Sequence, residues 1–163
     1  MKMIDELMQE MISYYKGDPK RIQHFLKVHS LARLIGLEEG LDENLLFTLE
    51  AAALIHDIGI REAEQKYGTC NGKLQEQEGP SLARQMLQRL HFDQSVSERV
   101  CYLVGHHHTY SGISGEDYQI LVEADFLVNL YEEESPRESI TSAYKKIFRT
   151  ASGKNLCRTM FGL

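Results

Sequence analysis

The stretch from Ala51 to Gly59 constrains the fold more than any other part of the chain. It reads Ala-Ala-Ala-Leu-Ile-His-Asp-Ile-Gly, so an apolar run passes directly into His56 and Asp57. Such a run is typical of a buried helix, and its last side chains should lie at the edge of the interior. Because burying an imidazole and a carboxylate without partners is costly, and both are good ligands of first-row metals, a cation is the natural compensation.

Most of the remaining sequence predicts amphipathic helices. Apolar residues recur at helical spacing, and no run rich in Val, Ile and Thr alternates with polar residues as a strand would. We therefore expect an all-α fold, a single-domain helical bundle of about six to eight helices. At 163 residues the chain is long enough for one such domain with a real core. The domain should span residues 1–163, with its core at about 20–131 and helices flanking it at both ends.

Local signals place the starts of these helices. Asp18 followed by Pro19, and Asp42, are typical N-terminal caps, and Ser-x-x-Glu capping boxes begin at Ser95 and Ser135. The expected helices begin near residues 4, 18, 42, 78, 95, 116 and 135.

Two segments show no helical pattern. Residues 58–77 are polar and contain three glycines, which predicts a long loop that covers one side of a functional site. A solvated connection with a short helix is the alternative. The tail after Ala151 is too short and mixed to interpret.

Several titratable residues fall on the apolar faces of the expected helices. His24 lies one turn before Val28, and Asp125 lies one turn after Leu121. Three consecutive histidines end the apolar face of another helix, with His107 most directly on its line. Since buried carboxylates and imidazoles are paired or bind metal, these positions are candidate metal ligands. The inward-facing set comprises His24, His56, Asp57, His107 with the flanking His106 and His108, and Asp125.

Composition excludes several classes of protein. The three cysteines are an odd number without CxxC spacing, which favours reduced thiols in a cytosol over a disulfide framework. The acidic balance, a net charge of -6, gives no electrostatic surface for a nucleic-acid polymer. An acidic N-terminus and the lack of a long apolar segment predict neither a signal peptide nor a membrane span. We therefore expect a soluble, cytoplasmic protein.

Three motifs in order resemble the HD-domain superfamily, an all-helical set of metal-dependent phosphohydrolases. They are Arg21-Ile22-Gln23-His24, then Ala53 to Gly59 with its His-Asp pair, then Glu123-Ala124-Asp125. The resemblance covers about residues 20–131. It implies that one metal is bound by His24, His56, Asp57 and Asp125.

Members with two metals add further ligands, and here the resemblance is less complete. Glu78-Gly79-Pro80 resembles a His-Gly-Pro segment, so Glu78 would replace a histidine. His106 to Gly112 resembles a His-His-Glu segment, in which the metal pair is either His106 with His107 or His107 with His108. The implied cofactor is one or two divalent ions, foremost Fe or Mn, with Mg, Ni, Co or Zn also compatible.

The resemblance implies hydrolysis of a phosphoester by a metal-activated water. The substrate would be a nucleotide or other small phosphorylated metabolite, with Asp57 bridging the metals and His56 beside it as a catalytic ligand. Many two-metal members carry a phosphate-holding lysine three residues after the aspartate, where this chain has Ile60. Arg61 or Lys66 is the expected substitute. The oligomeric state stays open, a homodimer being one option.

Two other functions fit the same ligand set. Some HD-domain proteins with two irons are oxygenases that cleave C–C or C–P bonds, and a non-catalytic metal-bound binding or sensor domain is the other alternative. A phosphate-holding cation near the site favours hydrolysis, whereas a dry pocket with two open iron positions favours oxygen chemistry.

Overall fold

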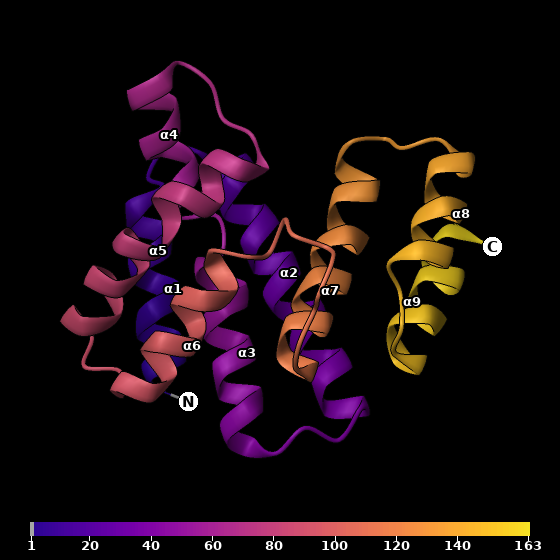
Figure 1. Ribbon diagram of the computed structural model, residues 1–163, viewed down its shortest axis with the longest axis horizontal. Coiled ribbons are helices and arrows are strands. Elements are labelled where there is room, and N and C mark those ends of the chain that lie inside the picture. Colours follow the sequence, from indigo (N-terminus) through magenta and orange to yellow (C-terminus); the bar gives the residue numbers. More distant parts are fainter. Residues whose placement is uncertain (1) are drawn as a thin grey trace.

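The computed structural model describes residues 2–163, which form nine helices and no strand (Figure 1). The all-α class expected from the sequence is therefore confirmed. The helices are α1 (Lys2–Tyr14), α2 (Pro19–Glu38), α3 (Glu43–Ile55), α4 (Gly59–Tyr67), α5 (Gly72–Arg89), α6 (Gln94–Val104), α7 (Glu116–Glu132), α8 (Arg137–Lys146) and α9 (Ala151–Phe161).

Two of the expected helix caps are present. The side chain of Asp18 accepts a hydrogen bond from the backbone N–H of Arg21, and that of Asp42 accepts one from Leu45. The two capping boxes are not. Helix α6 begins at Gln94 and α8 at Arg137, and in neither does the preceding residue cap the helix through its side chain. Helix α6 thus begins slightly earlier than the serine pattern predicted, with Ser95 inside its first turn.

The expected loop over residues 58–77 is wrong, because most of it is helical. It contains α4 and the first turns of α5, separated by a short connection. Asn71 caps α5 by accepting from the N–H of Leu74, so Glu78 to Pro80 lies inside this helix and does not open it. Helix α4 was not predicted because only Gly59 and Ala63 in it are buried, so its sequence has almost no apolar face with helical spacing.

Helix α3 is the centre of the packing and contacts α1, α2, α6 and α7. Its last turn, Ala51 to Ile55, is fully buried. Helices α2 and α7 pack against α3 and against each other, so the turn that follows α3 lies next to both of them. The hydroxyl of Tyr15, at the end of α1, donates to the backbone carbonyl of Asp57 at 2.6 Å and anchors this turn. The His56-Asp57 pair therefore lies in the middle of the bundle.

The C-terminal segment forms α8 and α9, which lie beside α7 (Figure 1). The buried carboxylate of Glu123 accepts from the backbone N–H groups of Arg149 and Thr150 and from the Thr150 hydroxyl. It thereby joins α7 to the start of α9, a helix that was not predicted from the sequence. Among the helices of residues 2–163, none has the length and apolar character needed to cross a bilayer.

Candidate metal centre

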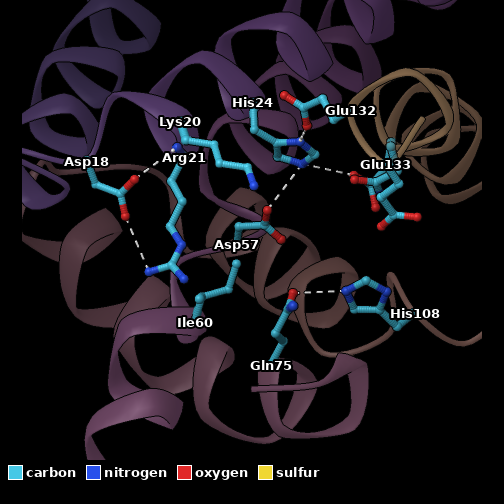
Figure 2. Close-up of a pocket in the computed structure, with 12 residues that line it drawn as sticks. Asp18, Lys20, Arg21, His24, Asp57, Ile60, Gln75, His108, Glu132 and Glu133 are labelled. Atoms are coloured by element: carbon cyan, nitrogen blue, oxygen red, sulfur yellow. Dashed lines mark hydrogen bonds and ion pairs between the residues drawn. The ribbon is translucent and has the colours of Figure 1, made fainter. Parts of the chain in front are cut away.

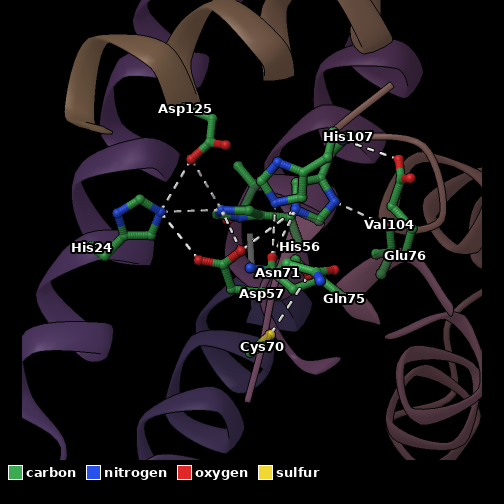
Figure 3. A network of polar contacts seen from close by, with 12 residues as sticks. His24, His56, Asp57, Cys70, Asn71, Gln75, Glu76, Val104, His107 and Asp125 are labelled. Atoms are coloured by element: carbon green, nitrogen blue, oxygen red, sulfur yellow. Dashed lines mark hydrogen bonds and ion pairs between the residues drawn. The ribbon is translucent and has the colours of Figure 1, made fainter. Parts of the chain in front are cut away.

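The first group of donor atoms comes from three separate elements (Figure 3). His24 projects from α2, His56 and Asp57 from the turn after α3, and Asp125 from α7. His24 Nε2 lies 3.1 Å from Asp125 Oδ1, 3.2 Å from Asp57 Oδ2 and 3.3 Å from His56 Nε2. His56 Nε2 lies 3.5 Å from the same Asp125 oxygen. Four polar atoms thus converge on one small volume.

The second group consists of Asp57, His107 and His108, whose donor atoms lie within 4.8 Å of one another. Asp57 Oδ1 is 3.5 Å from His107 Nε2 and 3.4 Å from His56 Nε2, while Oδ2 faces His24. The Asp57 carboxylate therefore lies between the two groups and belongs to both. His56 and His107 are both 0% exposed, so this arrangement is shielded from bulk water.

Hydrogen bonds fix which ring nitrogen of each buried histidine faces the centre. Nδ1 of His56 donates to the Ala53 carbonyl at 2.7 Å, and Nδ1 of His107 donates to the Val104 carbonyl at 2.9 Å. These acceptors require a proton on Nδ1, so in the neutral form of each ring the lone pair of Nε2 points inward. These Nε2 lone pairs face the carboxylate oxygens of Asp57 and Asp125, which are also hydrogen-bond acceptors. Because two acceptors repel each other, a positive charge is needed between them, either a proton or a metal ion.

The His24 ring shows this demand most clearly. Burial opposes its charged form, but hydrogen bonds to Asp125 and Asp57, together with their charges, outweigh burial and raise the pKa of His24 to about 11. On its other side, Nδ1 donates to Glu132 Oε1 at 2.6 Å. A proton on Nε2 satisfies the carboxylates in the absence of a metal, and it occupies the position that a cation would take.

The two carboxylates and His108 have pKa shifts that suit a cation. Burial raises the pKa of Asp57, but the nearby His56, His107 and His24 outweigh it and keep the carboxyl well below its usual range. The pKa of Asp125 is also lowered, because hydrogen bonds to His24 and His56, formed when these rings are protonated on Nε2, outweigh burial. Burial, followed by the neighbouring His107, lowers the pKa of His108 to about 4. At neutral pH the carboxylates are therefore ionised and His108 is neutral, which are the forms that bind metal.

The chemistry of the donors fits a first-row divalent ion. Imidazole nitrogens and carboxylate oxygens suit Fe, Mn, Co, Ni and Zn, and no cysteine takes part in either group. A carboxylate on the far nitrogen of a ligand histidine, as Glu132 is on His24, is a common feature of metal sites. The described residues therefore form two adjacent groups that are able to hold a divalent metal.

Three expected site residues are not brought to this centre. His106 stacks on Tyr102, with ring centroids 4.0 Å apart, so the pair in the second group is His107 with His108. The carboxylate of Glu78 accepts from the hydroxyl of Tyr67 at 2.8 Å and from Lys66 at 3.3 Å, outside both donor groups.

Arg61 is also directed away from the centre. Its guanidinium lies over the ring of Tyr14, 3.9 Å from the centroid, and donates to the Tyr14 carbonyl. Lys66, the other expected phosphate-holding cation, is paired with Glu62 and Glu78. Neither side chain lines the cavity beside the centre.

Other residues of the site were missed by sequence reasoning. Glu132 lies two turns after Asp125 on α7, a spacing that could have revealed it. Gln75 Oε1 lies 2.9 Å from His108 Nε2 and 3.3 Å from His107 Nε2. Glu76 accepts from the His108 backbone N–H and the Thr109 hydroxyl, and so fixes the segment after α6. Gln75 and Glu76 lie where a loop was expected, so the sequence could not place them.

A cavity of about 320 Å³ opens beside the centre (Figure 2). Its volume is at the lower end of the range for small-molecule sites. Most of its wall is polar or charged, and it includes four of the donor residues, His24, Asp57, His108 and Asp125. The lining residues are Asp18, Lys20, Arg21, His24, Asp57, Ile60, Gln75, His108, Asp125, Asn129, Glu132 and Glu133.

The fold and this centre define a class: an all-helical domain whose buried His and Asp side chains can hold divalent metal. The family model of the HD domain matches residues 21–144, well over half of the chain. The chain belongs to the HD-domain family, as the three ordered motifs indicated.

Comparison with solved structures agrees on the fold. The crystal structure of a predicted HD superfamily hydrolase from an uncultured Thermotogales bacterium superposes with a TM-score of 0.69 at 24% sequence identity. The match covers 97% of this chain and 84% of that one. No curated protein matched the sequence. Family membership and the two donor groups together support a general role as a metal-dependent hydrolase.

Proposed function

We propose that this protein is a metal-dependent phosphohydrolase that hydrolyses a phosphoester of a nucleotide or another small phosphorylated metabolite. The observation that carries the proposal is the position of Asp57, whose carboxylate faces His24 with one oxygen and His56 and His107 with the other. A carboxylate placed in this way can bridge two cations, an arrangement that suits displacement at phosphorus. The hydrolase named among the structural neighbours is consistent with it.

When bound, a divalent cation supplies a lowered pKa for the attacking water and neutralises negative charge on the phosphoryl oxygens. The chain itself contributes orientation. The carbonyls of Ala53 and Val104 hold the buried imidazoles of His56 and His107 in one tautomer, and Glu132 does the same for His24. Fe or Mn is the metal that we propose, because both accept mixed imidazole and carboxylate donors.

The cavity beside the centre favours hydrolysis over the oxygenase alternative. Its wall carries charged and amide side chains, with Lys20 extending into it (Figure 2). Such a wall suits an ionic substrate, whereas oxygen chemistry at two irons would call for a dry pocket. The volume of about 320 Å³ also favours a small molecule over a nucleic-acid polymer as the substrate.

The test is a panel of phosphoesters assayed with protein purified without chelator and analysed for metal. Hydrolysis should stop when a chelator is added and return with Mn or Fe. Asp57→Asn preserves the size of the side chain but removes its charge, so turnover should fall at least about a hundredfold. If the metal-loaded protein hydrolyses nothing in the panel but consumes oxygen with a phosphonate or polyol, it is an oxygenase and the proposal is wrong. Inactivity in both assays would favour the non-catalytic domain.

A further inference from the structure

Lys20 is a cation without a partner at the edge of the metal centre. It lies on α2, one turn before His24, and Figure 2 shows its amine end extending into the cavity on the side of His24 and Asp57. Within residues 2–163, no hydrogen bond or ion pair joins this amine to another side chain. A side chain with about 2 kcal/mol of rotamer entropy is therefore free to order around a ligand.

The other cations near the cavity are already engaged. Arg21 pairs with Asp18 at 3.3 Å and with Glu64 at 2.7 Å. Arg61 stacks on Tyr14, and Lys66 binds two glutamates on α4 and α5. Among the described residues that line the cavity, Lys20 is thus the one lysine or arginine that makes no ion pair.

The position of Lys20 in its helix is unfavourable for the helix itself. The first turn of α2 contains Lys20 and Arg21 and no acidic residue, although the positive end of the helix dipole disfavours cations there. Arg21 is compensated by its two carboxylates, whereas Lys20 is not. Helix stability therefore does not explain this lysine, but an anion in the cavity would interact favourably with both its charge and the helix N-terminus.

We propose that Lys20 binds the phosphoryl group of the substrate and that the site accepts a phosphomonoester. This inference rests on the proposed function. A single free cation beside the metal donors provides for one phosphoryl group, and Ile60, on the same cavity wall, adds no charge. Glu133 also lines the cavity and has no cationic partner among the described residues, so it would repel a second phosphate.

The first experiment measures binding of inorganic phosphate to the Mn-loaded full chain by calorimetry. Lys20→Met should weaken binding by about tenfold or more, because it removes one charge-assisted contact. Lys20→Arg keeps the charge and should stay within a few-fold of wild type. Lys16→Met is the matched control, since Lys16 is exposed and does not line the cavity. Metal content should be the same in all four proteins, because Lys20 is not a donor.

A second experiment does not depend on turnover. Acetylation of lysines in the Mn-loaded protein, followed by mass spectrometry, should show that phosphate slows modification of Lys20 and not of Lys16. Phosphate affinity of Lys20→Met within about twofold of wild type would overturn the assignment, even in an enzyme that hydrolyses phosphoesters.

The two proposals fail separately. If no phosphoester is hydrolysed but phosphate binding depends on Lys20, the hydrolase proposal fails and the anion site stands. The monoester specificity is tested by kcat/KM for a nucleoside monophosphate and its diphosphate. We expect the monophosphate to be preferred by at least about tenfold, and equal values or a preference for the diphosphate would overturn this part of the inference.

Discussion

At the scale of single residues, the centre depends on where each histidine places its second nitrogen. Backbone carbonyls hold His56 and His107, but His24 is held by a side chain, the Glu132 carboxylate. A carboxylate on the far nitrogen makes an imidazole a better ligand and fixes its orientation. Glu132 is therefore the residue outside the donor groups whose loss should affect metal binding most directly.

We expect Glu132→Gln to weaken metal affinity by about 10- to 100-fold while the protein still folds. The amide is of similar size but carries no charge to orient the His24 N–H and to balance a cation. Titration of the apo-protein with Mn measures the change. Glu133→Gln is the control, because this neighbour lines the same cavity without contacting His24. Equal affinities in the two variants would contradict the role of Glu132.

Arg61 contacts a residue that its position in the sequence does not indicate. It follows the His-Asp pair closely in the sequence, and it was therefore expected to hold phosphate. Instead its planar guanidinium stacks on Tyr14, a residue 47 positions earlier. An aromatic ring and a free carbonyl at the end of α1 offered this cation a closer partner than the cavity.

At the scale of elements, the contact between α4 and α5 determines the wall of the site opposite α2. Gly59 makes this contact possible: a Cβ added there would lie 2.8 Å from the Gln75 carbonyl oxygen and 2.8 Å from the Gly79 nitrogen. Both are backbone atoms and cannot rotate away. The side chain of Gln75, one residue of this contact, lies against His107 and His108. Helix packing and site geometry are therefore coupled through Gly59.

We expect Gly59→Ala to force α4 and α5 apart, with a loss of about 1–3 kcal/mol of stability. For a chain of this length the corresponding fall in Tm is roughly 2–12 °C. Metal affinity should also fall, because Gln75 moves with α5. Gln65→Ala is the control, since Gln65 is an exposed residue of the same helix. Thermal unfolding and Mn titration measure both effects, and a Gly59→Ala protein as stable as the control would refute the close contact.

At the scale of the whole molecule, the donors come from α2, the turn after α3, the segment after α6, and α7. The unfolded chain cannot bring these positions together, so a metal should bind the native state far more tightly. Free metal at about 100 times its Kd would then stabilise the fold by about 2.7 kcal/mol. Metal binding should therefore be visible as thermal stability, independently of any activity.

We expect Mn or Fe to raise the Tm of the apo-protein by roughly 5–10 °C at such a concentration. The increase should be lost in Asp57→Asn, which removes the charge shared by both donor groups. It should persist in Asp93→Asn, a change at an exposed residue before α6. Differential scanning calorimetry with and without metal measures the change in Tm for each protein. A shift of the same size in both variants would mean that the ion binds elsewhere.

The sequence by itself determined the helical class, the order of the HD-domain motifs and the inward direction of His24, His56 and Asp125. These features follow from local periodicity, because a residue one turn from a buried apolar side chain shares its face. The same reasoning placed the starts of α2 and α3, where Asp18 and Asp42 cap the helix.

Tertiary structure alone decided which of the other candidates reach the centre. The apolar pattern singles out His107 but leaves His106 and His108 as equal candidates beside it. In the folded chain His108 lies with His107 near Asp57, whereas His106 stacks on Tyr102. The placement of Glu78 and Lys20 likewise depends on residues distant in the chain or on the cavity between helices. Periodicity records which face of a helix is buried, but contacts across helices are set by the three-dimensional arrangement of the whole chain, which no local pattern encodes.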